Sequence, residues 1–279
     1  MMSEAASSIF SAIFPSECRF CNAPLSNVSR LPVCIECSSK ILPIAGDRCT
    51  VCAQVLPEGY PDKLGDGRCF ECTRDLPRFA RAVSFGAYEN ELREMIHLLK
   101  YQHVRPAAEF LGALIAESAI AMLPQMADEI LVLPVPLYKG KLRERGFNQA
   151  EMLAHAAVTR LAKTAPHKKF ELKASALFRR RATESQVGMS REQRLSNVRG
   201  AFAVPHKDAV KAREILLIDD VLTTGATVSE CARVLRRAGA AEVWVATAAR
   251  AVKLQTNPAA NFLGTEADVL AVANPARWS

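Results

Sequence analysis

The chain has 279 residues, 49% of them hydrophobic and 23% charged, which suits a globular α/β domain with a small additional module. It contains no run of about 18 apolar residues, so we expect no membrane insertion. The net charge of +7 is uneven, because residues 139–213 hold 18 Lys and Arg against 6 Asp and Glu. Such a block attracts phosphorylated small molecules or nucleic acid, unless it is only a solvated surface.

The N-terminal segment Met1–Phe14 is mildly apolar but has no basic leader. Serines interrupt its apolar run, and Cys18 follows directly. We therefore expect a short packing helix rather than a signal peptide, and a cytoplasmic protein.

Eight of the nine cysteines form four Cys-x-x-Cys pairs separated by 12, 11 and 16 residues. Two such pairs complete the tetrahedral four-sulfur site of structural zinc. The pattern therefore predicts a double zinc ribbon with two zinc ions in residues 1–78, where metal replaces a core that the segment lacks. The predicted ligands are Cys18, Cys21, Cys34, Cys37, Cys49, Cys52, Cys69 and Cys72.

The alternatives to this metal module are weaker. Four disulfides would suit a secreted domain, for which no export signal is present. Pairing in sequence, with Cys18–Cys37 in one site and Cys49–Cys72 in the other, is favoured, although spacing alone also permits interleaved pairing. The module holds 8 basic and 9 acidic residues, so folding and docking explain it at least as well as nucleic-acid contact.

Residues 79–279 alternate between strand and helix patterns, which predicts a second, α/β domain. In chain order we expect strand 82–88, a helix capped by Asn90, helix 106–122, strand 129–133, helix 148–163, strand 214–218, helix 227–238 and strand 242–249. Cys231 falls on the apolar face of its helix and is read as core. Parallel strands place ligands beyond their carboxyl ends, so the loops after Leu133 and Ile218 should carry the chemistry.

The segment Ile215–Thr227 is the strongest signal. A buried strand is followed by Asp219 and Asp220, and then by a Thr/Gly turn that opens a helix. Backbone amides at a helix start form an anion cradle. Two adjacent carboxylates can hold vicinal hydroxyls and order Mg²⁺ through water.

This segment resembles the phosphoribosyl-pyrophosphate (PRPP) motif of type I phosphoribosyltransferases over all thirteen positions. The resemblance implies that Asp219 and Asp220 meet the ribose hydroxyls. It also implies that the 5′-phosphate is wrapped by Thr223, Thr224, Gly225, Ala226 and Thr227. Ala226 stands where many members have glycine or threonine.

Nearly the whole chain is similar to the competence protein F (ComF) family. The resemblance is carried by the cysteine pairs after Phe14-Pro15, by Lys100-Tyr101, Val135-Pro136, Arg145–Gln149 and Thr183-x-x-Gln186, and by Arg194, Asn197 and Gly200–Phe202. It implies a zinc ribbon joined to a type I phosphoribosyltransferase-like domain with a parallel sheet core. Some members are linked to the uptake of single-stranded DNA.

Two basic segments complete the expected site. Pro134–Asn148, with Lys139, Lys141, Arg143 and Arg145, sits where type I enzymes keep a pyrophosphate loop. Arg179–Asn197 sits where they carry a mobile loop, whose candidates for reaching pyrophosphate are Arg179, Arg180, Arg181, Gln186 and Arg194. An exposed basic turn and a disordered surface loop are the respective alternatives.

The leading hypothesis is a phosphoribosyltransferase that binds PRPP with Mg²⁺, with Asp219, Asp220, Arg180 and Arg181 as the catalytic residues and with a link to DNA uptake. The alternative is a non-catalytic accessory protein that binds single-stranded DNA, uses the pocket as a nucleotide or PRPP sensor, and contacts DNA-uptake proteins. The zinc module takes the place of the hood that reads the nucleobase in this fold, so the acceptor stays open.

Overall fold

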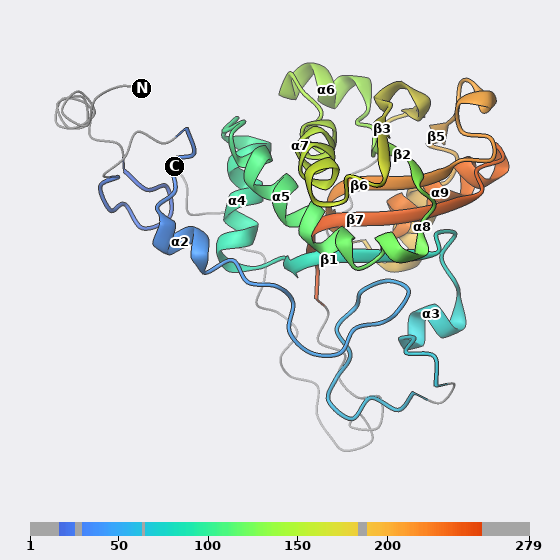
Figure 1. Ribbon diagram of the computed structural model, residues 1–279, viewed down its shortest axis with the longest axis horizontal. Coiled ribbons are helices and arrows are strands. Elements are labelled where there is room, and N and C mark those ends of the chain that lie inside the picture. The colour runs from blue at the N-terminus through green and yellow to red at the C-terminus, as the bar shows by residue number, and fades with distance from the viewer. Residues whose placement is uncertain (1–16, 26–29, 63–64, 184–188, 253–279) are drawn as a thin grey trace.

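The computed structural model describes residues 17–25, 30–62, 65–183 and 189–252 (Figure 1). The helix expected at Met1–Phe14 and the candidate Gln186 lie outside these ranges. Within the described ranges, none of the helices combines the length and apolarity that crossing a bilayer requires.

A five-stranded parallel sheet forms the centre of the domain, in the order β1-β7-β6-β2-β3. Its strands are Arg81–Ala87 (β1), Glu129–Pro134 (β2), Lys169–Leu172 (β3), Glu214–Leu222 (β6) and Glu242–Arg250 (β7). A separate antiparallel pair joins Phe178–Arg179 (β4) to Phe202–Ala203 (β5). The predicted α/β class with a parallel core is confirmed.

Helices cover both faces of this sheet. One face packs against Asn90–Tyr101 (α4), Ala107–Ile120 (α5) and Gln149–Thr164 (α7), and the other against Ala226–Arg237 (α9), beside Arg191–Val198 (α8). In β6, Leu216 and Ile218 enter the core on the first face, whereas Ile215 and Leu217 enter the core on the second. All four are fully buried, as expected for a central parallel strand.

The two cysteine clusters lie against different faces. Cys18 and Cys37 join the core that contains α4 and α5, whereas Cys49, Cys69 and Cys72 join the core that contains α9. Short helices Ile35–Ser39 (α2) and Phe70–Arg74 (α3) begin within the second knuckle of each cluster, with Cys34 and Cys69 as their N-caps (Figure 1).

The segment between the clusters and the first knuckle of the second cluster cover the edge of β1. The amide of Ile44 donates to the carbonyl of Phe85 at 2.8 Å, and the amide of Ala82 donates to the carbonyl of Val51 at 2.7 Å. An open strand edge invites pairing with other chains, so this cover protects the sheet.

Most predicted elements agree with the structure to within one or two residues, but four predictions are wrong. The helix expected to be capped by Asn90 has Glu89 as its N-cap. The segment Pro134–Asn148 is not only a loop, because it contains a helix, Lys139–Arg145 (α6), that ends at Gly146 in a left-handed conformation. The segment Arg179–Asn197 likewise contains most of α8.

The fourth wrong prediction, the end of strand β6, matters for the site. The strand predicted to end at Ile218 continues to Leu222, because Asp219 and Val221 stay paired with Thr247 and Ala249 of β7. The two acids therefore lie within a rigid strand, and the turn begins only at Thr223. Three 3₁₀ turns, Leu123–Gln125, Ala174–Ala176 and Lys207–Ala209, complete the described elements.

Candidate functional site

The eight paired cysteines form two clusters of four, each with its sulfur atoms within 4.8 Å of one another. The clusters are Cys18, Cys21, Cys34 and Cys37, and Cys49, Cys52, Cys69 and Cys72, so the pairing favoured from the sequence is confirmed.

The sulfur spacing fits zinc. Cys21 and Cys34 sulfurs are 3.8 Å apart, and those of Cys52 and Cys69 are 3.7 Å apart. A tetrahedron with Zn–S bonds of about 2.3 Å has edges of about 3.8 Å. These distances are far too long for disulfides, and all nine cysteines are free.

Backbone amides support the sulfur atoms as metal ligands. The Cys34 amide donates to Cys18 Sγ at 3.3 Å, and the Cys69 amide donates to Cys49 Sγ at 3.2 Å. Burial raises the pKa of the Cys18 thiol, but amide donors, the Cys34 amide first, outweigh it and lower the pKa to about 6. Amide donation to a sulfur atom thus favours the thiolate form, which zinc requires of a cysteine ligand.

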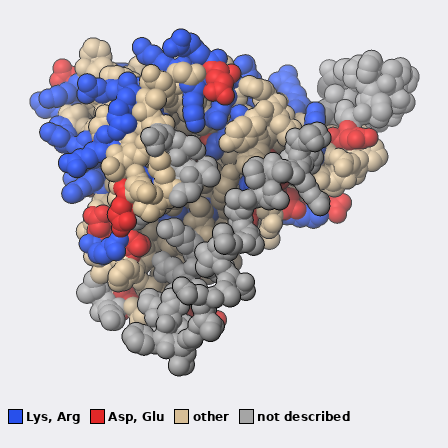
Figure 2. All heavy atoms as spheres, turned by 180° about the vertical axis from the view of Figure 1, so that it is seen from behind, with Lys and Arg blue, Asp and Glu red and all other residues tan. Residues whose placement is uncertain are grey.

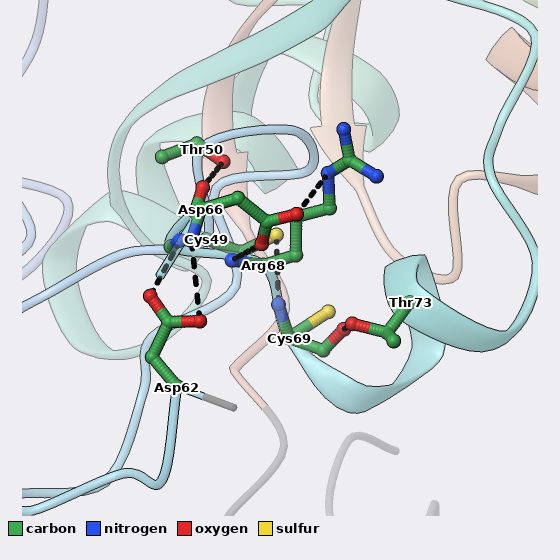
Figure 3. A network of polar contacts seen from close by, with 8 residues as sticks. Cys49, Thr50, Asp62, Asp66, Arg68, Cys69 and Thr73 are labelled. Atoms are coloured by element: carbon green, nitrogen blue, oxygen red, sulfur yellow. Dashed lines mark hydrogen bonds and ion pairs between the residues drawn. The ribbon is translucent and has the colours of Figure 1, made fainter. Parts of the chain in front are cut away.

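A polar network shapes the second cluster (Figure 3). The Asp62 carboxylate accepts the amides of Gly67 at 2.8 Å and Asp66 at 3.3 Å, and the Thr50 hydroxyl donates to the Asp66 carbonyl at 2.9 Å. Asp66 also pairs with Arg68 at 3.2 Å, one residue before Cys69. This network fixes the 16-residue connection between the two knuckles of that cluster.

Asp219 and Asp220 lie near the carboxyl end of β6, on opposite sides of the sheet as neighbours in a strand must. Asp219 Oδ1 accepts the amide of Asp220 at 2.9 Å. Asp220 is 5% exposed and pairs with the Lys100 ammonium of α4 at 2.8 Å. The Asp219 carboxylate is therefore the one that remains available to a ligand.

The charges around these acids are tightly coupled. Burial, and then the charge of Asp220, raises the pKa of the Asp219 carboxyl to about 7, against the opposing effects of Lys100 and Arg179. Burial lowers the pKa of Lys100, but the attraction of Asp220 outweighs it, so this pKa is raised. The site thus contains one firm ion pair and one carboxyl that titrates near neutrality.

The turn after β6 exposes backbone amides. Gly225 has a φ of 78°, and α9 begins at Ala226. Among the described residues, the amides of Thr224 and Gly225 have no hydrogen-bond acceptor. The Ala226 amide, the first of α9, donates to the Thr224 hydroxyl at 3.4 Å, so the amides that the turn offers near the positive helix end are those of Thr224 and Gly225.

A cavity of about 290 Å³ joins the acids to the basic segments. Its lining includes Asp219, Asp220 and Thr227 together with Lys141 of α6 and Arg179 of β4. The side chain of Arg179 lies over the Phe202 ring at 5.4 Å, and its Nε is buried without a hydrogen-bond partner in the described structure. Carboxylates and cations thus face the same space.

The other predicted phosphate ligands lie farther out. Lys139 and Arg143 are exposed on α6, whereas Arg145 donates to Gln149 Oε1 at 3.0 Å, and Gln149 lines the cavity. Arg180 is exposed, and Arg181 donates to the carbonyls of Asn197 and Arg199 at the end of α8. Arg194 donates to the Met189 carbonyl at 3.0 Å.

The residues Thr223, Thr224, Gly225 and Ala226 line a second cavity, of about 440 Å³, against the second cysteine cluster. Thr227 lines the first cavity instead, so the turn forms the boundary between the two spaces.

Sequence reasoning did not place Lys100 or Gln149 in the site. Lys100 ends an ordinary amphipathic helix, and no local pattern distinguishes a buried lysine from a solvated one. Gln149 follows the N-cap Asn148. The Asn148 side chain accepts the Ala150 amide at Oδ1 and donates from Nδ2 to the Val135 carbonyl. Lys100 and Gln149 entered the sequence analysis only as residues that carry the family resemblance, whereas the Asn148 cap could be predicted from its local pattern.

Comparison with known proteins adds the family. The Double zinc ribbon domain family matches residues 9–78. DNA utilization protein YhgH of Escherichia coli O6:H1 is 31% identical over 235 residues, which are 83% of this chain and 95% of that protein. The chain belongs to the family of YhgH and competence protein F. Competence protein F of Haemophilus influenzae is 28% identical over 78% of this chain and 96% of its own length.

This chain therefore joins a double zinc ribbon to an α/β domain, and its relatives are named for DNA utilization and competence. Among solved structures, glutamine PRPP amidotransferase of B. subtilis matches 51% of this chain and only 26% of its own. That match has 22% identity and a TM-score of 0.29, which is too distant to bear on the site.

Proposed function

We propose that this protein binds PRPP with Mg²⁺ at the turn after β6, across the boundary between the two cavities that the turn separates, as a type I phosphoribosyltransferase-like member of its family. The observation that carries the proposal is the nearness of the Asp219 carboxylate, which has no cation partner in the described structure and accepts only the Asp220 amide there, to the amides of Thr224 and Gly225, which have no acceptor among the described residues. A ribose phosphate offers hydroxyls to the first and an anion to the second.

The cations of the cavity suit a pyrophosphate group. Lys141 and Arg179 face the acids from α6 and β4, and the buried Arg179 Nε has no partner in the described structure. A guanidinium fork binds phosphate oxygens two at a time. Arg180 and Arg181, the arginines proposed from the sequence, would have to turn inward from the surface to take part.

Magnesium fits the donor set. Hard oxygen ligands such as the Asp219 carboxylate suit Mg²⁺, which usually keeps most of its waters and binds through one or two carboxylates together with substrate phosphates. Bound there, the ion would neutralise charge on the pyrophosphate, while Lys100 holds Asp220 in place.

In the proposed reaction an acceptor nucleophile bonds to C1 of the ribose as the bond from C1 to the pyrophosphate oxygen breaks. The departing pyrophosphate takes the electron pair, so negative charge grows on the side of Lys141 and Arg179. Preorganised cations of this kind stabilise such charge. The acceptor remains unassigned.

Thermal unfolding in the presence of PRPP and Mg²⁺ tests the proposal. PRPP with Mg²⁺ should raise the Tm of the wild type, and Asp219→Asn with Asp220→Asn should abolish the rise. Glu242→Gln, at the far end of β7, is the matched control and should keep it. An equal rise in the double variant would refute the site.

A second candidate function is binding of single-stranded DNA, which a surface beside the cavity favours. Tyr101 is 63% exposed, and Arg145 lies over its ring at 5.5 Å. Exposed aromatic rings next to cations stack bases and hold phosphates. Lys and Arg also gather on the side of β3 and β5 in Figure 2.

Part of that basic charge is already neutralised. Near β3, Lys168 and Lys169 pair with Asp128 and Glu129, and Arg213 pairs with Glu171. The surface at Tyr101 is therefore the better candidate. Arg143→Glu with Arg145→Glu should weaken binding of an oligonucleotide and flatten its dependence on salt; unchanged affinity would reject this function.

A further inference from the structure

Arg250 ends β7 and is 5% exposed. Its backbone lies beside Leu222, the last residue of β6, and its side chain lines the 440 Å³ cavity between the second cysteine cluster and the turn after β6. An arginine buried at such a junction needs partners for its guanidinium.

The partners of Arg250 come from both sides of the junction. Nη1 donates to the carbonyl of Leu222 at 2.7 Å, to that of Thr223 at short distance, and to that of Ala251 at 3.2 Å. Nε donates to the carbonyl of Cys52 at 3.1 Å. Within the described chain all four acceptors are backbone carbonyls, and no carboxylate pairs with the guanidinium.

Cys52 belongs to the second cluster, whose sulfur spacing fits zinc. Leu222 and Thr223 begin the turn whose Thr224 and Gly225 amides have no acceptor. One planar group thus bridges the start of the anion cradle and a metal knuckle whose Cys52 lies 198 residues before Arg250 in sequence. A lysine could not do this, because a single ammonium lacks the rigid fork.

The contact is reinforced by packing. Cys49, Cys69 and Cys72 share a buried core with Leu222 and Ala226. The first cluster has no part in this core, because Cys18 and Cys37 pack with α4 and α5. Any coupling between metal and turn should therefore be specific to the second cluster.

We propose that Arg250 is a positioning residue that couples zinc binding at the second cysteine cluster to the geometry of the Thr223–Thr227 turn. Filling the cluster fixes the Cys52 carbonyl, and the guanidinium transmits that position to the carbonyls of Leu222 and Thr223. The amides of the turn then keep the orientation that an anion needs. The role in ligand binding rests on the proposed function, whereas the coupling itself does not.

Hydrogen exchange of the ligand-free protein tests the coupling. In Arg250→Lys, the hydrogen-bonded amides around the turn, those of Ala226, Ser229 and Ala251, should exchange about tenfold faster, the change expected from losing one hydrogen bond to a charged group. Zinc content should stay at two ions, and exchange in β2 should be unchanged. The matched control is Arg237→Lys, at an exposed arginine of α9.

Metal removal supplies the second arm. Cys69→Ser should accelerate exchange in the same turn, whereas Cys34→Ser in the first cluster should not. Cys69→Ser with Arg250→Lys should be no faster than the faster of its two single variants. Simple additivity, or a turn unaffected by Arg250→Lys, would overturn the proposal. Because loss of the second ion can unfold the chain, Arg250→Lys alone is decisive.

Ligand fragments separate the two proposals. Arg250→Lys should weaken ribose 5-phosphate binding about tenfold and leave pyrophosphate binding unchanged, since only the turn is disturbed. If the wild type binds neither fragment but exchange changes as expected, the coupling holds and the proposed function fails. If both fragments bind and exchange does not change, the coupling fails alone.

Discussion

At the scale of single residues, the site depends on how three charges are shared. Lys100 is committed to Asp220, so Asp219 carries the carboxyl whose charge changes near neutral pH. A ligand that brings its own cation would favour the ionised form of Asp219.

Asp219→Asn should change how stability depends on pH. The Asp219 pKa is about 7 in the folded protein and 3.8 for an ordinary aspartate, so between these pH values the folded state holds more protons than the unfolded state. The wild type should therefore lose stability as pH rises from about 4 to about 7. The asparagine variant should lack this fall.

Urea unfolding at about pH 5 and pH 8 checks this, and the two proteins should diverge by about 2 kcal/mol between these conditions after solvent screening is allowed for. Parallel pH profiles would show that Asp219 has an ordinary pKa.

Lys100→Met should destabilise the protein strongly, because it leaves the buried Asp220 carboxylate without its partner. The expected loss is roughly 3–5 kcal/mol, and adding Asp220→Asn should recover most of it. Lys169→Met, which removes the exposed pair with Glu129, should cost less than about 1 kcal/mol. Chemical denaturation measures the unfolding free energy of all three variants. Equal losses of stability in Lys100→Met and Lys169→Met would contradict a buried Lys100–Asp220 ion pair.

At the scale of elements, the important join is the one between β6 and α9. The strand stays paired with β7 to Leu222, and Gly225 then takes a left-handed conformation that lets α9 begin at once. The amides of Thr224 and Gly225 are left without an acceptor in the described structure. The cradle is therefore a product of one tight turn.

Gly225→Ala should disturb this turn, because a Cβ disfavours the left-handed conformation by about 1–2 kcal/mol per residue. We expect a stability loss of that size and a weaker thermal shift with ribose 5-phosphate than the wild type shows. Calorimetric titration of the fragment measures the second effect. An unaltered affinity would mean that the turn does not hold the phosphate.

At the scale of the whole molecule, the two cysteine clusters attach the N-terminal segment to opposite faces of the sheet. Contacts from the segment between them also cover the β1 edge. Buried residues of the N-terminal segment and of the α/β domain share the same cores. The boundary between two domains expected at residues 78 and 79 remains a prediction.

Zinc counts in double variants test the pairing of the cysteines. Cys21→Ser with Cys34→Ser should leave one ion, because both lie in the first cluster. Cys21→Ser with Cys52→Ser should leave none, because each removes a ligand from a different cluster. Atomic absorption gives the counts; the reverse order would indicate interleaved sites.

Much of the fold was predictable from local sequence. The Cys-x-x-Cys pairs specify metal sites through ligand chemistry, and the buried runs and helix periodicities specify the sheet and helices through burial. The acids and the Thr/Gly turn after Ile218 could also be predicted, because they are adjacent in the sequence and form a local pattern. Even α8 had a signal, since Ser190 and Gln193 form the capping box at its start.

Other features depended on contacts between distant segments. The extension of β6 past Asp219 follows from pairing with β7, and the buried Lys100–Asp220 pair joins residues 120 positions apart. The bridge from Arg250 to Cys52 spans 198 positions. The sequence by itself determined which chemical groups are present and which local elements carry them, because ligand type and periodicity are local properties. Only the tertiary structure decided which charges are paired and which remain open to a ligand, because that depends on which segments the fold brings together.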